Sequence, residues 1–374
     1  MKRKLSIIPF TKVNYPLITC EPTDFEISAV IAPHGVGIEG NDISVLRNRE
    51  QIGLYGSSNL SKGYDSCDVV LIPDVGHLSN RGDDSKLVNR TTIIRDYTIN
   101  ALEEAIEHRK DILCFSSMDI EDQKKYLHSC ESKGIKFQYY DRTRIDTIMS
   151  NKLREISVPV VFVGETSHDC DGYEIFLKLI QSFNADKKKV LALSEDKYNA
   201  LYKQYSVTFW NHNDPMQNVI NIKNYVARLA DETKPDVILI KLPEPMTKFD
   251  DDITYDFGMT AFLLSQALPV SYMIYCSLYS LLNPQLMSNL SESFMAKYGY
   301  PISAVHISNQ ITDFREDDKD TMQTAFIDFK SNMKDIRNET DIPFYNLNNT
   351  DDYNKFYETL YDELFEIPYG VIAL

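Results

Sequence analysis

The side chains best placed for chemistry lie in a single segment in the second half of the chain. This segment is predicted to form a strand, a polar turn and a helix. The β-branched run 158–164 predicts a buried strand, and apolar spacing from Tyr173 onwards predicts a helix. A phosphate-binding loop has this shape, because backbone N–H groups at the helix N-terminus hold phosphate oxygens. The turn supplies our first candidate ligand-binding residues, which are Gly164, Glu165, Thr166, Ser167, His168 and Gly172.

This turn lacks what a nucleotide-hydrolysing loop needs. The working pattern is GxxxxGK[ST], in which the lysine reaches the β- and γ-phosphates and the hydroxyl holds magnesium. Here Asp169–Asp171 stand five to seven residues after Gly164, and Gly172 follows only at the eighth position. The next lysine is Lys178, inside the predicted helix. ATP and GTP are therefore disfavoured as cofactors, and a purely structural turn is the alternative.

A carboxylate follows a second buried strand. The run 236–242 is apolar and β-branched, and Glu244 stands between two prolines directly after it. Ligands bind at the carboxyl ends of parallel strands, so Glu244 is our best single carboxylate candidate. If a nucleotide were bound, a lysine from elsewhere, such as Lys241 or Lys178, would have to reach the turn.

A glycine-rich motif lies in the first half. Gly35, Gly37 and Gly40 spell GxGxxG after the predicted strand 27–33, as in dinucleotide-binding folds. That strand is the second one, however, and no convincing helix or acidic strand end follows it. A glycine-rich surface loop is favoured, with His34, Gly35 and Gly37 kept as candidate ligand-binding residues.

Other catalytic patterns are absent from the sequence. CxxC, HExxH and GxSxG do not occur, and six scattered cysteines favour a reducing cytoplasm over disulfides. Adjacent side chains such as those of His168–Asp171 seldom ligate one ion, so no metal site is predicted. The triplet Asp256–Gly258 matches a kinase motif without its companions. A Ser/His/Asp triad stays open, since its members need not be neighbours in sequence.

The net charge of the chain indicates which classes of partner it can attract. The chain has 55 acidic and 39 basic residues, a formal net charge of −16. This charge repels phosphate backbones, so nucleic acid is not an expected partner, whereas a basic partner is favoured. The uncharged stretch 257–291 is interrupted by Gln266 and Pro269, which favours a helix followed by a buried strand over a membrane span.

Strand and helix patterns alternate along both halves, which predicts an α/β protein of two domains with mainly parallel sheets flanked by helices. The predicted bounds are 1–150 and 158–374, joined by a polar helix within 142–157. The segment 318–337 is expected to be helical, and 370–374 to form an edge strand.

The order of several segments resembles that of the clostridial peptide maturation system proteins, which accompany biosynthesis of ribosomally made, modified peptides. These segments are IIPF, VIAPHGVGIEGND, VFVGETSHDCDGYEIFLKLI, KPDVILIKLPEPM, FGMTAFLLSQALPVSYMIYCSLYS and YGYPISAVHISN. The resemblance implies a Rossmann-like first half and a phosphate-loop-like second half, but no catalytic residues.

It also implies an accessory role, in which the protein binds a precursor peptide, a carrier or a modifying enzyme. Two alternatives stay open. One is a nucleotide-dependent ligase or transferase with an atypical phosphate loop, and the other is a non-catalytic oligomeric scaffold.

Overall fold

The computed structural model describes residues 2–35, 37–76, 78, 90–147, 153–168, 170–210, 214–248, 254–279, 283–313, 323–326 and 341–366. The chain divides into two compact units. Unit 1 comprises Met1–Arg142 and Lys197–Ser206, and unit 2 comprises Thr143–Asp196 and Val207–Leu374. The short segment Lys197–Ser206 thus belongs to the first unit, although the sequence pattern placed it in the second.

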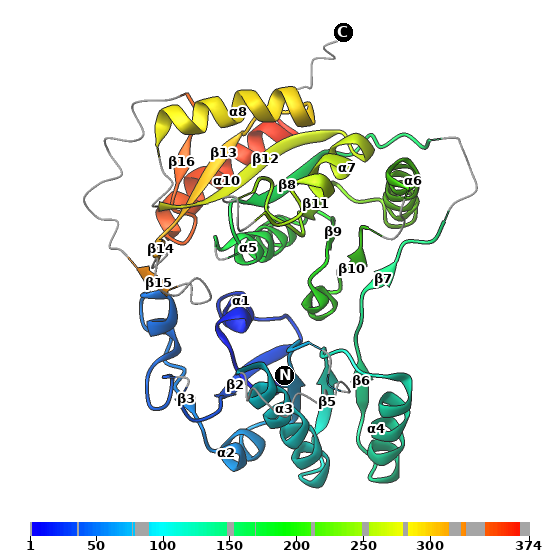
Figure 1. Cartoon of the computed structure of the whole chain (residues 1–374), viewed down its shortest axis with the longest axis vertical. Helices are drawn as coiled ribbons and strands as arrows, with labels where there is room; N and C mark the ends of the chain where they lie inside the picture. The colour runs from blue at the N-terminus through cyan, green and yellow to red at the C-terminus, as the bar shows by residue number, and fades with distance from the viewer. Residues whose placement is uncertain are drawn as a thin grey trace. The chain divides into compact units, whose positions relative to one another are not determined.

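Unit 1 is built on one parallel sheet with strand order β3-β2-β1-β4-β5-β6 (Figure 1). The strands are β1 (Arg3–Ile7), β2 (Phe25–Ile31), β3 (Gly56–Ser57), β4 (Val69–Ile72), β5 (Asp111–Cys114) and β6 (Phe137–Tyr139). The helices are η1 (Lys12–Asn14), α1 (Tyr15–Thr19), η2 (Ile43–Arg47), α2 (Leu60–Asp65), α3 (Arg90–Glu107), α4 (Ile120–Ser132) and η3 (Lys197–Tyr202).

Apolar strands hold this sheet together. Every residue of β4 is buried, as expected for a central parallel strand covered on both faces. Ala101, Leu102 and Ala105 of α3 belong to the same hydrophobic cluster as Val70 and Ile72. The helical periodicity of α3 therefore turns one face onto the sheet.

Unit 2 contains an eight-stranded sheet with order β16-β13-β12-β8-β11-β9-β10-β7, and its described pairings are parallel. The strands are β7 (Thr143–Arg144), β8 (Val160–Glu165), β9 (Val190–Ser194), β10 (Tyr205–Thr208), β11 (Val237–Lys241), β12 (Val270–Leu278), β13 (Ala304–Ser308) and β16 (Phe344–Tyr345). A separate antiparallel hairpin joins β14 (Gln310–Asp313) and β15 (Gln323–Phe326).

The helices of unit 2 are α5 (Gly172–Ala185), α6 (Pro215–Thr233), α7 (Met259–Ala267), α8 (Pro284–Tyr298) and α10 (Thr350–Phe365). From β8 the chain crosses through α5 towards β9, and from neighbouring β12 it crosses through α8 in the opposite direction, towards β13. Right-handed crossovers in opposite directions place α5 and α8 on opposite faces, as Figure 1 shows. The two strands β8 and β12 therefore form the point where the topology reverses, which is a usual ligand position.

The predicted architecture of two mainly parallel sheets flanked by helices is confirmed. The uncharged stretch folds as α7, a break at Pro269 and β12, as expected. Among the described residues, no helix is long and apolar enough to cross a membrane.

Two of three local predictions differ from the structure. The predicted helix within 142–157 is wrong where described, because Thr143–Arg144 pair as β7 and 145–147 and 153–157 are not helical. The predicted helix 318–337 is wrong at Gln323–Phe326, where pairing with β14 overrides the polar composition. Its remaining residues, and the predicted strand 370–374, lie outside the described residues.

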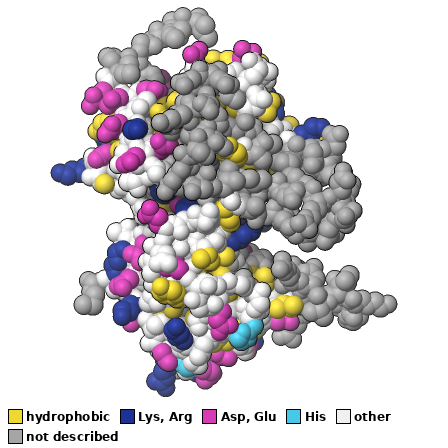
Figure 2. All heavy atoms as spheres, turned by 90° about the vertical axis from the view of Figure 1, so that its left-hand side faces the viewer, with side chains coloured by type: hydrophobic (Ala, Val, Ile, Leu, Met, Phe, Trp, Pro, Cys, Tyr) yellow, Lys and Arg dark blue, Asp and Glu magenta, His cyan; other side chains and the backbone are white. Residues whose placement is uncertain are grey.

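Charged side chains are mixed over the surface. Figure 2 shows one face of the molecule, on which Lys and Arg occur singly or in small groups between Asp and Glu. No broad basic area is visible among the described residues of this face. This distribution agrees with the net charge of −16.

Candidate functional site

The turn after β8 is closed by its own carboxylates. Glu165 is the last residue of β8, and its side chain lies against the backbone of Gly172, where α5 begins. A Cβ atom built at Gly172 would lie 1.9 Å from Oε1 of Glu165. Only glycine therefore leaves room for this carboxylate beside the first turn of the helix.

Lys241, from the end of β11, is the partner of this carboxylate. Its Nζ lies 3.8 Å from Oε1 of Glu165 and 4.0 Å from Oδ2 of Asp196, and it donates a hydrogen bond to the carbonyl of Leu242. Burial raises the pKa of Glu165 more than Lys241 and His168 lower it. Burial alone would lower the pKa of Lys241, but attraction by Glu165 and Asp196 raises it overall.

Asp171 directly precedes α5 in a left-handed conformation, with a φ of 65°, and its side chain makes no hydrogen bond to the first turn of the helix. Its buried carboxylate accepts hydrogen bonds from Ser308 Oγ at 2.7 Å and from Asn348 Nδ2 at 2.9 Å. His306 Nε2 and Gln310 Nε2 approach it at 3.4 Å each. This carboxylate ties the helix start to the end of β13 and to the chain before α10.

This cluster contains a serine, a histidine and an aspartate, but they are not arranged as a catalytic triad. In a triad the serine hydroxyl bonds to the histidine, and the histidine bonds to the aspartate. Here Ser308 and His306 both point to Asp171, and Nδ1 of His306 accepts a hydrogen bond from the backbone of Leu347. All these side chains are buried, so the arrangement stabilises the fold and does not activate a nucleophile.

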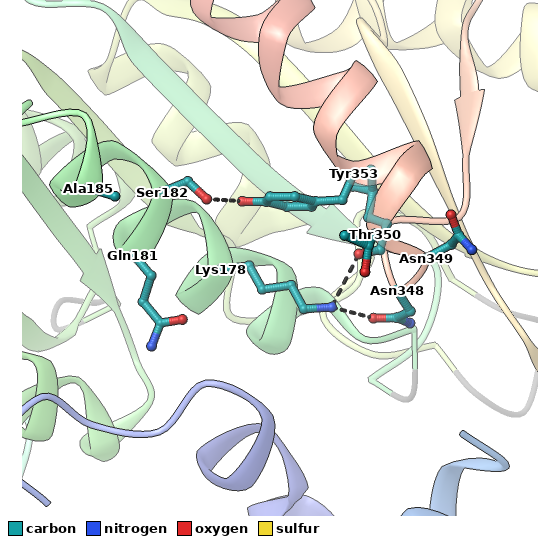
Figure 3. A pocket seen from close by; sticks show the side chains of 9 residues that line it. Lys178, Gln181, Ser182, Ala185, Asn348, Asn349, Thr350 and Tyr353 are labelled. Carbon is teal, nitrogen blue, oxygen red and sulfur yellow. Dashed lines mark hydrogen bonds between the residues drawn. The ribbon is translucent and has the colours of Figure 1, made fainter. Parts of the chain in front are cut away.

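Counted from the helix start, Tyr173 and Glu174 stand where a phosphate loop has its lysine and its magnesium-binding hydroxyl. Glu174 is buried and pairs with Lys178 at 3.1 Å. Lys178 also donates to the carbonyl of Leu347 and to Oδ1 of Asn348 (Figure 3). Lys178 is thus bonded to Glu174 and to the chain before α10, and Lys241 lies beside Glu165.

Figure 3 shows the shallow space around Lys178, about 380 Å³ in volume, between α5 and the start of α10. Ser182 and Tyr353 are hydrogen-bonded to each other across it at 2.8 Å, whereas Gln181 points away from α10. The polar groups facing this space are thus largely engaged with one another.

A larger cavity, which we call the edge cavity, opens at the carboxyl ends of β9, β10 and β11. It has a volume of about 660 Å³, within the range of small-molecule sites. Carboxylates of Glu195, Glu244 and Asp256 line it, together with the aromatic or apolar side chains of Trp210 and Met259. The described lining residues include no lysine or arginine.

His168 and Glu244 form an ion pair beside this cavity. His168 Nε2 lies 3.2 Å from Oε2 of Glu244, and the imidazole packs edge-on against Tyr255. Tyr255 in turn donates to Ser167 at 3.3 Å. The hydrogen bond to Glu244 raises the pKa of His168 despite partial burial. These candidates are thereby brought together, and Thr166 is held apart from them by two bonds to the carbonyl of Cys276.

The glycine-rich motif of unit 1 forms an open loop. Gly35, Gly37 and Gly40 all have positive φ, and a Cβ at each would meet nothing within 4 Å. The glycines therefore allow the positive φ angles of an open loop after β2, and no close contact requires them. His34 is exposed and pairs with Glu39 at 3.3 Å on the surface.

Residues that the sequence reading missed occupy the reversal point of the first sheet, between β1 and β4. The Tyr198 hydroxyl accepts hydrogen bonds from Asn14 Nδ2 at 2.8 Å and from the backbone of Asp74 at 2.9 Å. Lys197 donates to Phe115 O at 2.9 Å and to Ser117 Oγ at 2.7 Å. The segment Lys197–Ser206 thus fills the position where a Rossmann-like fold would bind a ligand.

The remaining motifs have structural roles. Asp256 accepts hydrogen bonds from the backbone of Gly258 and Thr260 at the start of α7, so the kinase-like triplet is a helix cap. All six cysteines are described, and all are buried thiols outside disulfides. The described residues contain no group of three His, Cys, Asp or Glu that could hold a metal ion. The three consecutive aspartates Asp250–Asp252, for which the sequence favours a solvated acidic loop over a cation site, lie outside the described residues.

Comparisons with known proteins extend only to the fold. No protein-family model matches the chain, and no curated protein matches its sequence. Among solved structures, the chain is similar to a DUF1611 family protein from Anabaena variabilis, with a TM-score of 0.59 and 10% identity. The match covers 98% of this chain and 100% of that one. At this identity the likeness shows a shared fold and nothing about activity.

Proposed function

We propose that this is a cytoplasmic accessory protein of peptide natural-product maturation, which binds a basic segment of a precursor peptide, a carrier or a modifying enzyme. In this proposal it does not use a nucleoside triphosphate. The observation that carries the proposal is the position of Glu165, whose carboxylate lies against Gly172 at the start of α5.

This position matters because a phosphate would need the same place. In a phosphate loop the first backbone N–H groups of the helix face the anion. Glu165 lies against this helix start, and the carboxylate of the preceding residue, Asp171, is bonded nearby to Ser308 and Asn348, so a triphosphate would bring further negative charge to a place that already holds carboxylates. The repulsion between like charges at such short range opposes binding.

The nature of the partner rests on the overall charge and on the resemblance described above. A net charge of −16 attracts basic segments at long range and repels nucleic acids. Modified-peptide pathways supply such partners in the form of precursor peptides and of the enzymes that act on them. Neither a membrane nor a nucleic acid is required by the proposal.

The second candidate is a nucleotide-dependent ligase or transferase, and one observation favours it. Lys241 brings a cationic group from the neighbouring strand to the turn, 3.8 Å from Glu165. This lysine is buried and faces two carboxylates, Glu165 and Asp196, so its charge is already offset within the protein. The accessory role therefore remains the better supported of the two.

An affinity experiment tests the accessory role. The full-length protein is immobilised and exposed separately to each peptide and enzyme encoded beside its gene. We expect retention of at least one basic partner, weakened by salt because the attraction is between exposed charges. Retention of none of them in low salt would contradict the proposal.

A further inference from the structure

We propose that the edge cavity binds the guanidinium group of an arginine side chain in a peptide. This inference rests on the proposed function, because it names the feature by which a basic partner would be recognised. It starts from the position, charge and aromatic wall of the cavity.

The cavity lies where parallel sheets usually bind ligands. Glu195 directly follows β9, Thr208 ends β10, and Glu244 follows β11, so three strand ends meet at one opening. Its volume of about 660 Å³ can hold a side chain together with the neighbouring backbone of a peptide.

The charged groups of its lining favour a cation. The carboxylate of Glu195 accepts a hydrogen bond from the backbone of Phe209, and that of Asp256 accepts two from backbone groups. The described lining therefore holds three carboxylates and no lysine or arginine. Glu244 has His168 as its partner, and this pair is half-exposed at the opening.

The aromatic wall favours guanidinium over ammonium. Trp210 is 39% exposed and lines the cavity with Tyr255 and Met259. A planar guanidinium can stack on an aromatic face while it donates two parallel hydrogen bonds to a carboxylate. A lysine ammonium is a strongly hydrated point charge and gains less from such a wall.

The chain offers a direct readout, because Trp210 is its only tryptophan. The fluorescence of the full-length protein is followed during titration with acetyl-Ala-Arg-Leu-amide. The matched probe is the same peptide with citrulline, which keeps the shape of arginine and lacks its charge. A third titration uses free arginine, to separate a peptide ligand from the amino acid.

We expect a saturable change with the arginine peptide and binding about tenfold weaker with the citrulline peptide and with free arginine. The double variant Glu195→Gln/Glu244→Gln should weaken binding of the arginine peptide by about tenfold or more. The control Glu292→Gln, an exposed site on α8, should not change it. Thermal unfolding of each variant establishes that it is folded.

Equal binding of the arginine and citrulline peptides, or an unchanged affinity in the double variant, would overturn the inference. So would the absence of any fluorescence change with the arginine peptide. If that absence were accompanied by retention of a basic partner in the affinity experiment, the accessory role would survive and only the assignment of this cavity would fail. Tighter binding of free arginine would replace the peptide with a small-molecule ligand.

Discussion

The two sheets of this protein differ at the carboxyl ends of their strands. In unit 1 the reversal point is filled by Tyr198, whose hydroxyl joins the chain after β1 to the chain after β4. In unit 2 the turn at the reversal point is filled by Glu165 and Asp171, but the neighbouring strand ends leave the edge cavity open.

The difference shows how one kind of edge can serve stability or recognition. Where polar groups bond to one another and are buried, as around Tyr198 and Lys197, removal of a group should mainly affect folding. Where charged and aromatic side chains are exposed around a cavity, as with Glu244 and Trp210, removal should mainly affect binding.

The largest effect is expected in unit 1, for Lys197→Met. The Lys197 side chain is 4% exposed, and Asp74 and Asp141 lie 3.3 and 3.6 Å from its Nζ. Removing it leaves carboxylates and buried acceptors without their cation, at a cost of about 3–5 kcal/mol. Urea unfolding measures this free energy.

The control Lys203→Met removes an exposed pair with Asp24 and should cost about 1 kcal/mol or less. Equal losses in the two variants would contradict the structural role.

The next effect is in unit 2, for Lys241→Met. This variant leaves the buried Glu165 without its nearest cation, and we expect a loss of about 2–4 kcal/mol. The double variant Lys241→Met/Glu165→Gln should recover part of that loss, since no buried charge of the pair remains. Additive losses in urea unfolding would show that the two side chains are not coupled.

A smaller effect is expected for Gly172→Ala. The added methyl group must displace the Glu165 side chain, at a cost of about 1–3 kcal/mol. The same substitution in a Glu165→Ala background should cost less, because the space is then free. An equal cost in both backgrounds would place the strain elsewhere in the turn.

The smallest effect concerns pH. The bond to Glu244 raises the pKa of His168, so this pair stabilises the fold fully below the unfolded pKa of about 6.5. Its contribution is lost as the pH rises through the raised pKa of the folded protein. The pair is half-exposed, so the effect on stability is small. An NMR titration of His168 should give a lower pKa in Glu244→Gln, and an unchanged pKa would contradict the pairing.

Much of the fold could be predicted from the sequence. Long apolar runs such as those of β4, β8 and β11 mark buried parallel strands, and Pro269 separates α7 from β12. Short or polar elements could not be predicted in this way. The strands β7 and β15 have few apolar residues. They are strands because β7 pairs with the distant β10 and β15 pairs with the preceding strand β14.

The candidate site could be predicted in part. The sequence predicted His168 and Glu244, which pair beside the edge cavity, and Glu165, which lies against Gly172. The donors to Asp171 lie 135 to 177 positions away in sequence, so no local pattern reveals them. One usable signal in the sequence is its only tryptophan, Trp210, which stands two residues after the end of β10.

Isothermal titration calorimetry with ATP, GTP and NAD(H), with and without magnesium, tests the central claim most directly. Glu165 occupies the space beside the helix start that a phosphate would need, and Asp171 directly precedes it. We therefore predict no binding heat at millimolar nucleotide. Micromolar binding that is abolished by Gly172→Trp, in a variant shown to be folded, would contradict this account and favour the nucleotide-dependent enzyme.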